Sequence, residues 1–258
     1  MIRKHNKVMK KIISLLVIVI FTITSTKASH LPGGNITYEC VGPDQYLVTL
    51  TMYEDCQTGF MTPGSSFTIN VVNSCGLPAQ VLNATEIVFG NEVSQLCPTA
   101  QSTCNGGTLP GVQEHQYQVL VTLPGPCDSW TFYHTSCCRN GSVNATSTVD
   151  DYYFYATLNN LDAPCNNSPT YTAPPIPYVC SGQSVCYSLG VVEVDGNSLV
   201  YSLTDALEDP ALTPVVYSAG YSGANPIPGI TIDPATGQVN FIAPGMVGQY
   251  LVVILIEE

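Results

Sequence analysis

Positive charge is almost absent from this sequence after its first 27 residues. The 258-residue chain has seven lysines and arginines, and six of them precede residue 28: Arg3, Lys4, Lys7, Lys10, Lys11 and Lys27. A chain that starts at Ser29 keeps Arg139 against 19 acidic residues, a formal net charge of −18. Because a nucleic-acid-binding protein needs a basic surface, the sequence excludes nucleic acid as a partner and disfavours anionic membranes. Metal cations and cationic partners remain open, and most of the acids serve solubility.

Long hydrophobic runs are also missing. The apolar stretch at residues 12–23 has 12 residues, whereas a membrane-spanning helix needs about 20. It follows a basic segment, 2–11, and precedes the small residues Thr26 and Ala28. This order is typical of a secretory signal peptide. We therefore expect residues 1–28 to be removed, the mature chain to have no transmembrane segment, and the protein to be secreted to the outer cell surface.

The sequence has no Cys-x-x-Cys motif, which argues against zinc, but it has many cysteines. All eleven follow the predicted signal peptide: Cys40, Cys56, Cys75, Cys97, Cys104, Cys127, Cys137, Cys138, Cys165, Cys180 and Cys186. In an exported chain such usage predicts a disulfide framework, whose connectivity the sequence leaves open. The odd number leaves one thiol over or paired outside the chain. Adjacent side chains in a strand point to opposite faces, so Cys137 and Cys138 are each expected to reach a different part of the fold.

Long helical periodicity is absent, and alternation typical of strands is common. Alternating apolar residues predict strands at 45–53, 117–123 and 152–158, and shorter candidates lie at 67–72, 86–89 and 130–134. Glycine- and proline-rich turns separate them. The sequence therefore predicts an all-β protein of two disulfide-containing, β-sandwich-like domains. The segment 163–183, with five prolines, separates a cysteine-rich domain at 29–165 from a second domain at 166–258.

The second domain carries a turn signal and an abrupt end. In "DPATG", Pro234 presets one backbone angle and Gly237 supplies a left-handed position, so we expect a hairpin there. The chain stops inside the apolar run 250–256, "YLVVILI". We therefore expect a longer protein, with the second domain truncated at its C-terminal end.

Several short motifs along the chain resemble those of known protein families. Residues 30–170, with "SHLPGGNITYEC", "QYLVTLTMYEDC", "LCPTAQSTCNGG", "CCRN" and "LNNLDAPCNNSP", resemble the N-terminal module of large secreted Bacteroidetes surface proteins of the gliding-motility-associated, type IX secretion type. Residues 166–258, with "NNSPTY", "EVDGNSLVYSL" and "ITIDPATGQVNFIAP", resemble the cadherin-like and putative Ig repeats of bacterial adhesins. Glu193 and Asn197 replace acids of that repeat. The resemblance implies a cell-surface role, a second domain of the Ig/cadherin-like type, and no catalytic activity.

The candidate catalytic bases are His30, His115 and His134, and none of them lies in a nucleophile-elbow motif. Oxidised cysteines are poor nucleophiles, and adjacent acids on a strand point to opposite faces, so acid pairs alone make no glycosidase dyad. The sequence therefore predicts a protein that is not an enzyme. The run "DYYFY" at 151–155 with Trp130 offers a stacking platform for a glycan, although alternating aromatic residues in a strand more often pack a core.

Calcium is the one cofactor that the sequence suggests, and no organic cofactor is expected. Glu193, Asp195 and Asn197 alternate in the loop "VEVDGNSL", and calcium binds hard oxygens in irregular geometry. Asn167, with Asn166, lies at the start of this domain and Asp162 just before it, where cadherin-like repeats place further ligands. The alternative is an ordinary acidic β-turn.

Arg139 is predicted to be structural. Its planar guanidinium can hold a carboxylate and cap carbonyl oxygens beside Cys137 and Cys138, which lysine cannot copy.

The whole sequence predicts a non-catalytic extracellular surface protein, the outer module of an adhesin or matrix-forming protein, associated with gliding. Its expected partners are cell-surface or matrix components, polysaccharide or protein. The alternatives are a glycan-binding module and part of a secreted hydrolase.

Overall fold

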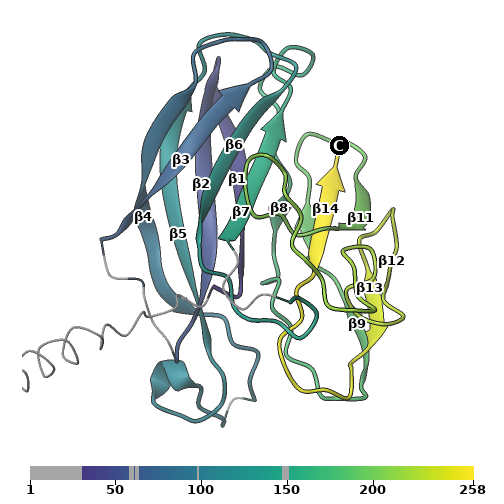
Figure 1. Cartoon of the computed structure of the whole chain (residues 1–258). Coiled ribbons are helices and arrows are strands. Elements are labelled where there is room, and N and C mark those ends of the chain that lie inside the picture. Colours follow the sequence, from purple (N-terminus) through teal and green to yellow (C-terminus); the bar gives the residue numbers. More distant parts are fainter. Residues whose placement is uncertain (1–30, 58–60, 62–63, 98, 147–150) are drawn as a thin grey trace, which may run out of the picture.

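The computed structural model describes residues 31–57, 61, 64–97, 99–146 and 151–258, so the predicted signal peptide lies outside the described residues. The chain is all-β, and its strands fall into two units (Figure 1). The first unit is a seven-stranded antiparallel sheet in the order β1-β2-β5-β4-β3-β6-β7. Its strands are β1 (Gly33–Gly42), β2 (Gln45–Asp55), β3 (Ser66–Asn73), β4 (Gln80–Glu92), β5 (Val112–Thr122), β6 (Trp130–Cys137) and β7 (Asp151–Leu158). A short 3-10 helix, η1 (Thr103–Asn105), lies between β4 and β5.

All six strands predicted from alternation are confirmed in this sheet. The apolar set of β2 faces the core, with Tyr46, Val48, Leu50 and Met52 buried. The sequence missed β1, because its segment begins with two glycines and has only Ile36 and Tyr38 as alternating apolar residues before its end.

The sheet curves until its two edge strands, β1 and β7, lie side by side. The Tyr38 hydroxyl on β1 donates to the Thr157 carbonyl on β7 at 2.9 Å. The inner face encloses one apolar core, whose largest members include Trp130, Tyr46, Tyr117, Phe132 and Leu50. The first unit is therefore one curved sheet around a single core, with its two edge strands adjacent, and the predicted all-β class is confirmed.

The segment after β7 covers the outer edge of β1. The Tyr38 N–H donates to Ser168 Oγ at 2.8 Å, and the Ser168 N–H donates to the Tyr38 carbonyl at 3.0 Å. The Cys40 N–H donates to Asn167 Oδ1 at 2.8 Å. An uncovered edge strand would offer free backbone groups to another chain. The start of the proline-rich boundary segment is thus part of the first unit's packing.

Four disulfides are formed, and all of them lie between residues 40 and 165. They pair Cys40 with Cys165, Cys56 with Cys104, Cys75 with Cys127, and Cys137 with Cys138. The disulfide framework is confirmed. The expectation that Cys137 and Cys138 reach different parts of the fold was wrong, because β6 ends at Cys137 and the strand alternation on which it rested stops there.

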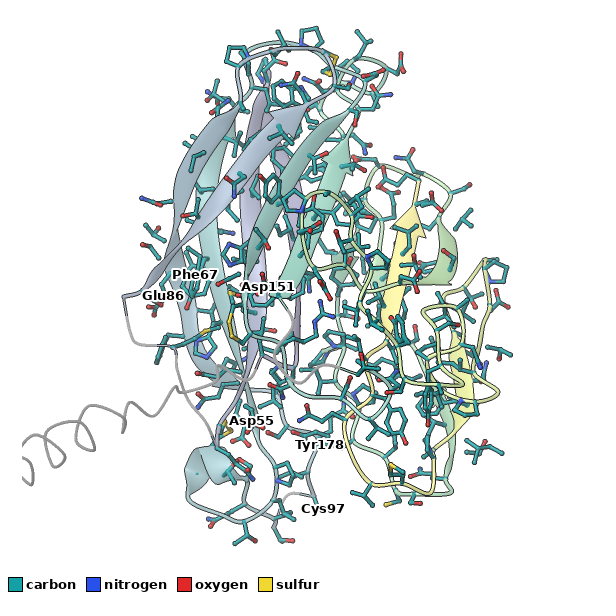
Figure 2. All side chains as sticks on the ribbon, in the orientation of Figure 1. Asp55, Phe67, Glu86, Cys97, Asp151 and Tyr178 are labelled. Carbon is teal, nitrogen blue, oxygen red and sulfur yellow. A yellow bond between two sulfur atoms is a disulfide. The ribbon has the colours of Figure 1, made fainter. Side chains whose placement is uncertain are left out.

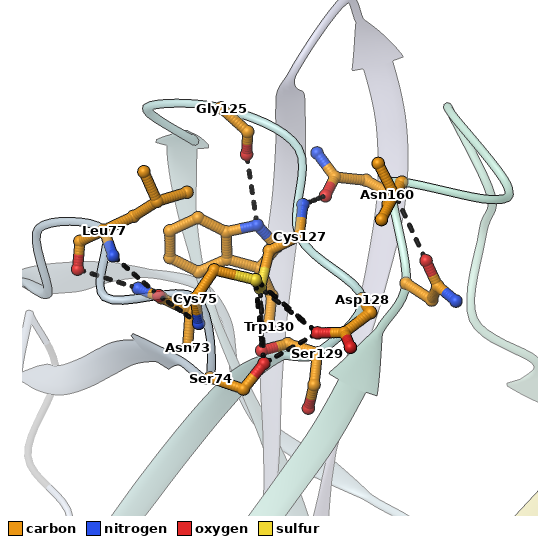
Figure 3. Close-up of a disulfide and its surroundings, with 12 residues drawn as sticks. Asn73, Ser74, Cys75, Leu77, Gly125, Cys127, Asp128, Ser129, Trp130 and Asn160 are labelled. Carbon is orange, nitrogen blue, oxygen red and sulfur yellow. Dashed lines mark hydrogen bonds between the residues drawn. A yellow bond between two sulfur atoms is a disulfide. The ribbon is translucent and has the colours of Figure 1, made fainter.

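The Cys75–Cys127 disulfide ties two loops together at one end of the sheet (Figure 3). Asn160 Oδ1 accepts the Cys127 N–H at 2.8 Å, and the Trp130 indole N–H donates to the Gly125 carbonyl at 3.3 Å. Asn73 Oδ1 accepts the N–H groups of Cys75 and Leu77. These bonds satisfy loop backbone groups around the buried Trp130.

The second unit consists of small antiparallel sheets. They are formed by β8 (Thr170–Tyr171) with β10 (Val191–Val192), β11 (Val200–Thr204) with β14 (Val253–Glu257), and β12 (Thr231–Ile232), β13 (Val239–Ile242) and β9 (Ser184–Tyr187) in that order. Its core gathers around Ile227, Ile230 and Val239. The hairpin predicted at "DPATG" is confirmed: Gly237 has φ of 68° and donates its N–H to the Asp233 carbonyl at 2.9 Å.

The second unit lacks the disulfide that the sequence predicted. Cys180 and Cys186 are unpaired and exposed, as is Cys97 of the first unit. Cys186 lies on β9 opposite Asn240, while Cys180 precedes a turn and donates its N–H to Gln183 Oε1. Three cysteines are therefore unpaired, whereas the odd total of eleven cysteines suggested one. No helix among the described residues is long and apolar enough to cross a membrane.

Candidate functional site

Four of the five residues predicted to bind calcium, Glu193, Asp195, Asn197 and Asn167, lie together where the two units meet. Both Asp195 carboxylate oxygens accept hydrogen bonds from Asn167: its N–H donates at 2.7 Å and its side-chain amide at 2.9 and 3.1 Å. Asn167 Oδ1 accepts the Cys40 N–H of β1 at the same time. Asn167 therefore links the large sheet to the loop that contains Glu193 and Asp195.

The Glu193 carboxylate closes that loop. Its two oxygens accept the backbone N–H groups of Asp195, Gly196 and Asn197, at 2.7, 2.5 and 2.7 Å. Gly196 has φ of 86°, a left-handed conformation that glycine adopts without strain. The loop does not form the alternative hairpin turn, because the strands on either side, β10 and β11, pair with β8 and β14.

Glu258, which the sequence analysis missed, completes the cluster. Asn166 donates its amide to Glu258 Oε2 at 2.5 Å, and Asn197 donates to the same oxygen at 3.3 Å. Asn197 also donates to Asn166 Oδ1 at 3.1 Å. Burial raises the pKa of Glu258, and the negative charges of Glu193 and Asp195 raise it further, against the lowering effect of the amide bonds. Glu258 is 92 residues from Asn166, so no local pattern could have found it.

Asp162 is held elsewhere than the sequence predicted. Its carboxylate accepts the Asn159 amide at 2.8 Å, and its N–H donates to Asn159 Oδ1 at 3.0 Å. An Asn side chain that bonds its own following backbone makes a local turn. The structure thus uses Asp162 in the turn after β7, and the residues brought together are Glu193, Asp195, Asn197 and Asn167.

The cluster has the donor chemistry that calcium prefers, in a hydrogen-bonded arrangement. Calcium takes carboxylate and amide oxygens, and Glu193, Asp195 and Glu258 supply the carboxylates. In the structure these carboxylates accept N–H donors instead. Among the described residues, the one group of three potential metal ligands within 4.8 Å of one another is Cys75, Cys127 and Asp128, whose cysteines form a disulfide. An ion at the junction would replace amide hydrogen bonds, with Asn166 and Asn197 presenting their oxygens.

Arg139 fastens the two units at a second place. One guanidinium nitrogen, Nη2, donates to the Asp151 carbonyl at the start of β7 at 3.0 Å, and to the Leu207 carbonyl of the second unit at 2.9 Å. The Arg139 backbone also forms an isolated parallel β-bridge with Leu31, which is buried. Arg139 thus caps two carbonyl oxygens, one of them that of Asp151, which pairs with Cys137 across β6 and β7. Its structural role stays a prediction.

Arg139→Lys is expected to destabilise the fold by about 1–2 kcal/mol and Arg139→Ala by about 2–4 kcal/mol, because hydrogen bonds from a charged group contribute about 1.5–3 kcal/mol each. A single ammonium cannot copy the guanidinium fork. Thermal melts of the two variants against the wild type measure both. An Arg139→Ala protein that melts like the wild type but loses a bound anion would show that Arg139 is a ligand-binding residue.

Asn144 is the residue that joins the units most closely, and the sequence analysis missed it. It is 0% exposed. Its amide donates to the carbonyls of Pro226 and Leu251 at 2.9 and 2.8 Å, and its Oδ1 accepts the Leu251 N–H at 2.8 Å. Its own carbonyl accepts the Ser218 N–H at 2.9 Å. The loop after β6 thus inserts an asparagine into the second unit.

The candidate catalytic histidines that the structure describes are enclosed, and His30 lies outside the described residues. His115 is 0% exposed, its Nε2 is 3.2 Å from Glu54 Oε2, and its Nδ1 accepts the Gly90 N–H at 3.3 Å. His134 is also buried, with Nδ1 2.8 Å from the Thr68 carbonyl, and burial lowers its pKa. Both side chains are packed away from solvent.

The aromatic residues of β7 lie on both faces of the strand, and half of them are buried. Trp130 is 0% exposed, and Tyr152 and Tyr153 are buried. The rings of Tyr152 and Phe154 stack with centroids 4.9 Å apart. Trp130 and Tyr152 belong to the core, as that interpretation predicted. Tyr155 is 38% exposed and stacks on Tyr153, with ring centroids 5.2 Å apart, on the opposite face of the strand.

Neither protein-family models, nor curated proteins, nor solved structures give a match to this chain.

Proposed function

We propose that this chain is a non-catalytic extracellular surface protein, the outer module of an adhesin or matrix-forming protein. The observation that carries the proposal is the fastening of its two β units. Asn144 and Arg139 join them on one side, and Asn167 with Asp195 joins them on the other. A joint closed by several separate bonds transmits force without bending, which is what a surface stalk requires.

The disulfides support the same function. Bridges that span 125, 48 and 52 residues staple the large sheet, and such bridges persist in oxidising, extracellular compartments. The enclosed His115 and His134 favour a binding or structural role over a catalytic one.

The expected result in the native cells is a mature chain that begins at Ser29 and binds a conformation-specific antibody on intact cells. Mass spectrometry of the purified protein determines the N-terminus, and flow cytometry of intact and permeabilised cells determines the exposure. A chain that retains Met1 and reacts with the antibody only after permeabilisation would contradict the proposal.

We further propose that calcium tightens the junction. The cluster contains three carboxylates, Glu193, Asp195 and Glu258. Burial raises the pKa of Glu258, the charges of Glu193 and Asp195 raise it further, and a cation would relieve that repulsion. Asn166 and Asn197 would supply amide oxygens. When bound, the ion would cross-link the segment after β7, the loop at 193–197 and the end of β14.

Calcium at 2 mM is expected to raise the melting temperature by about 1–7 °C relative to chelator, given the roughly 0.1–1 mM dissociation constants of extracellular calcium modules. Asp195→Asn removes one charge from the cluster and should abolish this shift. Asp233→Asn, in the hairpin turn at 233–237, is the matched control and should retain it. Equal wild-type melts in calcium and in chelator would eliminate the ion from the proposal.

A further inference from the structure

The outer face of three neighbouring strands carries regular rows of uncharged polar side chains. The register of β1, β2 and β5 aligns Thr37 with Thr49 and Gln118 in one row, and Asn35 with Thr51 and Gln116 in the next. Neighbouring strands lie about 4.8 Å apart and alternate residues of a strand about 6.8 Å apart. The face is therefore a two-dimensional array of hydroxyl and amide groups.

The second unit turns this face into a groove. A cavity of about 440 Å³ is floored by both polar rows and walled by residues 170–174, which include β8. Small-molecule sites commonly have volumes of about 300–1,000 Å³. Farther along the same segment, Tyr178 lies near Asp55 at the end of β2 (Figure 2). The groove thus exists only because the two units are fastened together.

The polar groups of the groove are held in place and retain bonding capacity. Gln118 donates its amide to Thr49 Oγ1 at 3.0 Å, and Gln116 donates its amide to Glu114 Oε1 at 3.0 Å. A carboxamide has two N–H donors and two acceptor lone pairs. Each of these bonds uses one N–H, so each glutamine side chain keeps one donor and two acceptor positions. The side chains are therefore oriented before a ligand arrives, which lowers the entropy cost of binding.

We propose that this groove binds a neutral polysaccharide. Sugar hydroxyls both donate and accept hydrogen bonds, and threonine hydroxyls and asparagine and glutamine amides do the same. Two tyrosines, Tyr53 and Tyr171, also line the groove.

The charge of the groove selects against acidic sugars. Its lining includes the carboxylate of Glu114 and no lysine or arginine. The one basic residue after Lys27, Arg139, donates to carbonyl oxygens at the fastening between the units. A sulfated or uronic-acid chain would meet repulsion and no counter-charge in the groove.

A peptide fits this floor poorly. Peptides that extend a sheet need unpaired backbone groups, whereas β2 and β5 are paired on both sides, and Asn167 and Ser168 bond to the outer edge of β1. The groove offers side-chain groups, and these suit a ligand that is rich in hydroxyls.

The inference rests on the proposed function in one respect, the extracellular location, where the protein would encounter polysaccharides. The binding test uses purified protein, so a failure to bind leaves the surface location untouched, and a failure of export leaves the binding result untouched.

The test is isothermal titration of the disulfide-intact chain with laminarin, mannan, xylan, pullulan and galactan, with alginate and dextran sulfate as anionic comparisons. We expect at least one neutral polysaccharide to bind with a dissociation constant below about 5 mM, and neither anionic one to bind. Gln116→Leu and Thr49→Val each remove polar groups at nearly constant volume, and each should weaken binding about 3- to 10-fold.

Thr157→Val is the matched control, because Thr157 is exposed on β7 and is not part of the groove lining. Its binding should stay within about twofold of the wild type. Thermal melts verify that each variant is folded. If one groove variant fails to fold, the binding of the other is compared with that of the wild type. Binding of no neutral polysaccharide, or binding that neither folded groove variant weakens, overturns the inference.

Discussion

Asn144→Leu is expected to lower the free energy of unfolding by about 3–5 kcal/mol. Leucine has the same branching of heavy atoms as asparagine but larger methyl groups and none of its hydrogen-bonding groups. The variant would leave the carbonyls of Pro226 and Leu251 and the N–H of Leu251 without the partner that the structure gives them. A buried polar group that loses its partner costs about 1–3 kcal/mol.

Denaturant unfolding, monitored by tryptophan fluorescence and by far-ultraviolet circular dichroism, measures this effect. Trp130 is the only tryptophan and lies in the core of the first unit. If the fastening couples the two units, the fluorescence transition should move with the circular-dichroism transition, although Asn144 bonds to the second unit.

Thr146→Val is the matched control for Asn144→Leu. Thr146 lies in the same loop, is exposed, and donates its hydroxyl to the Val216 carbonyl at 3.0 Å. Removal of this exposed bond should cost less than about 1 kcal/mol. Equal losses in the two variants would mean that the burial of Asn144 does not matter and would refute the coupling.

Removal of the Cys40–Cys165 disulfide is the second large effect. The double variant Cys40→Ala/Cys165→Ala is expected to lose about 5 kcal/mol, because the bridge spans 125 residues and restricts the unfolded chain accordingly. The same bridge lies beside Asn167 and Ser168, which cover the edge of β1. Its loss should therefore also expose that edge, detected as faster amide hydrogen exchange in β1.

The Cys56–Cys104 bridge supplies the comparison, since it spans 48 residues. Its double alanine variant should lose about 4 kcal/mol on the same argument, without faster exchange at the β1 edge. Equal exchange in β1 for both variants would show that Asn167 and Ser168 hold the edge without the bridge.

The strands of the large sheet could be predicted because their signal is local. The set Tyr46, Val48 and Leu50 alternates along the chain, and one face of β2 is buried as a result. β1 escaped prediction because its two glycines and short alternation carry little signal, and its place at the edge depends on pairing with β2. The Cys137–Cys138 pair also escaped, since the strand alternation used for these residues ends where β6 ends.

The residues of the candidate site also fall into those with a local sequence signal and those without one. Glu193 and Asp195 were found because alternate acids near a glycine form a recognisable loop. Asn167 was found through the resemblance of the segment before it. Glu258 and Asn144 carried no signal, because their partners lie between 61 and 107 residues away.

The sequence by itself determined the all-β fold class, the acidic surface, the disulfide framework as a class and the loop that holds Asp195. Each of these follows from composition or from alternation over a few residues. Only the tertiary structure decided which cysteines pair, that Asn144 and Arg139 fasten the units, and that Thr49, Gln116 and residues 170–174 form one groove. The physical reason is that strand register and the docking of distant segments are set by packing of the whole chain, which no short stretch of sequence contains.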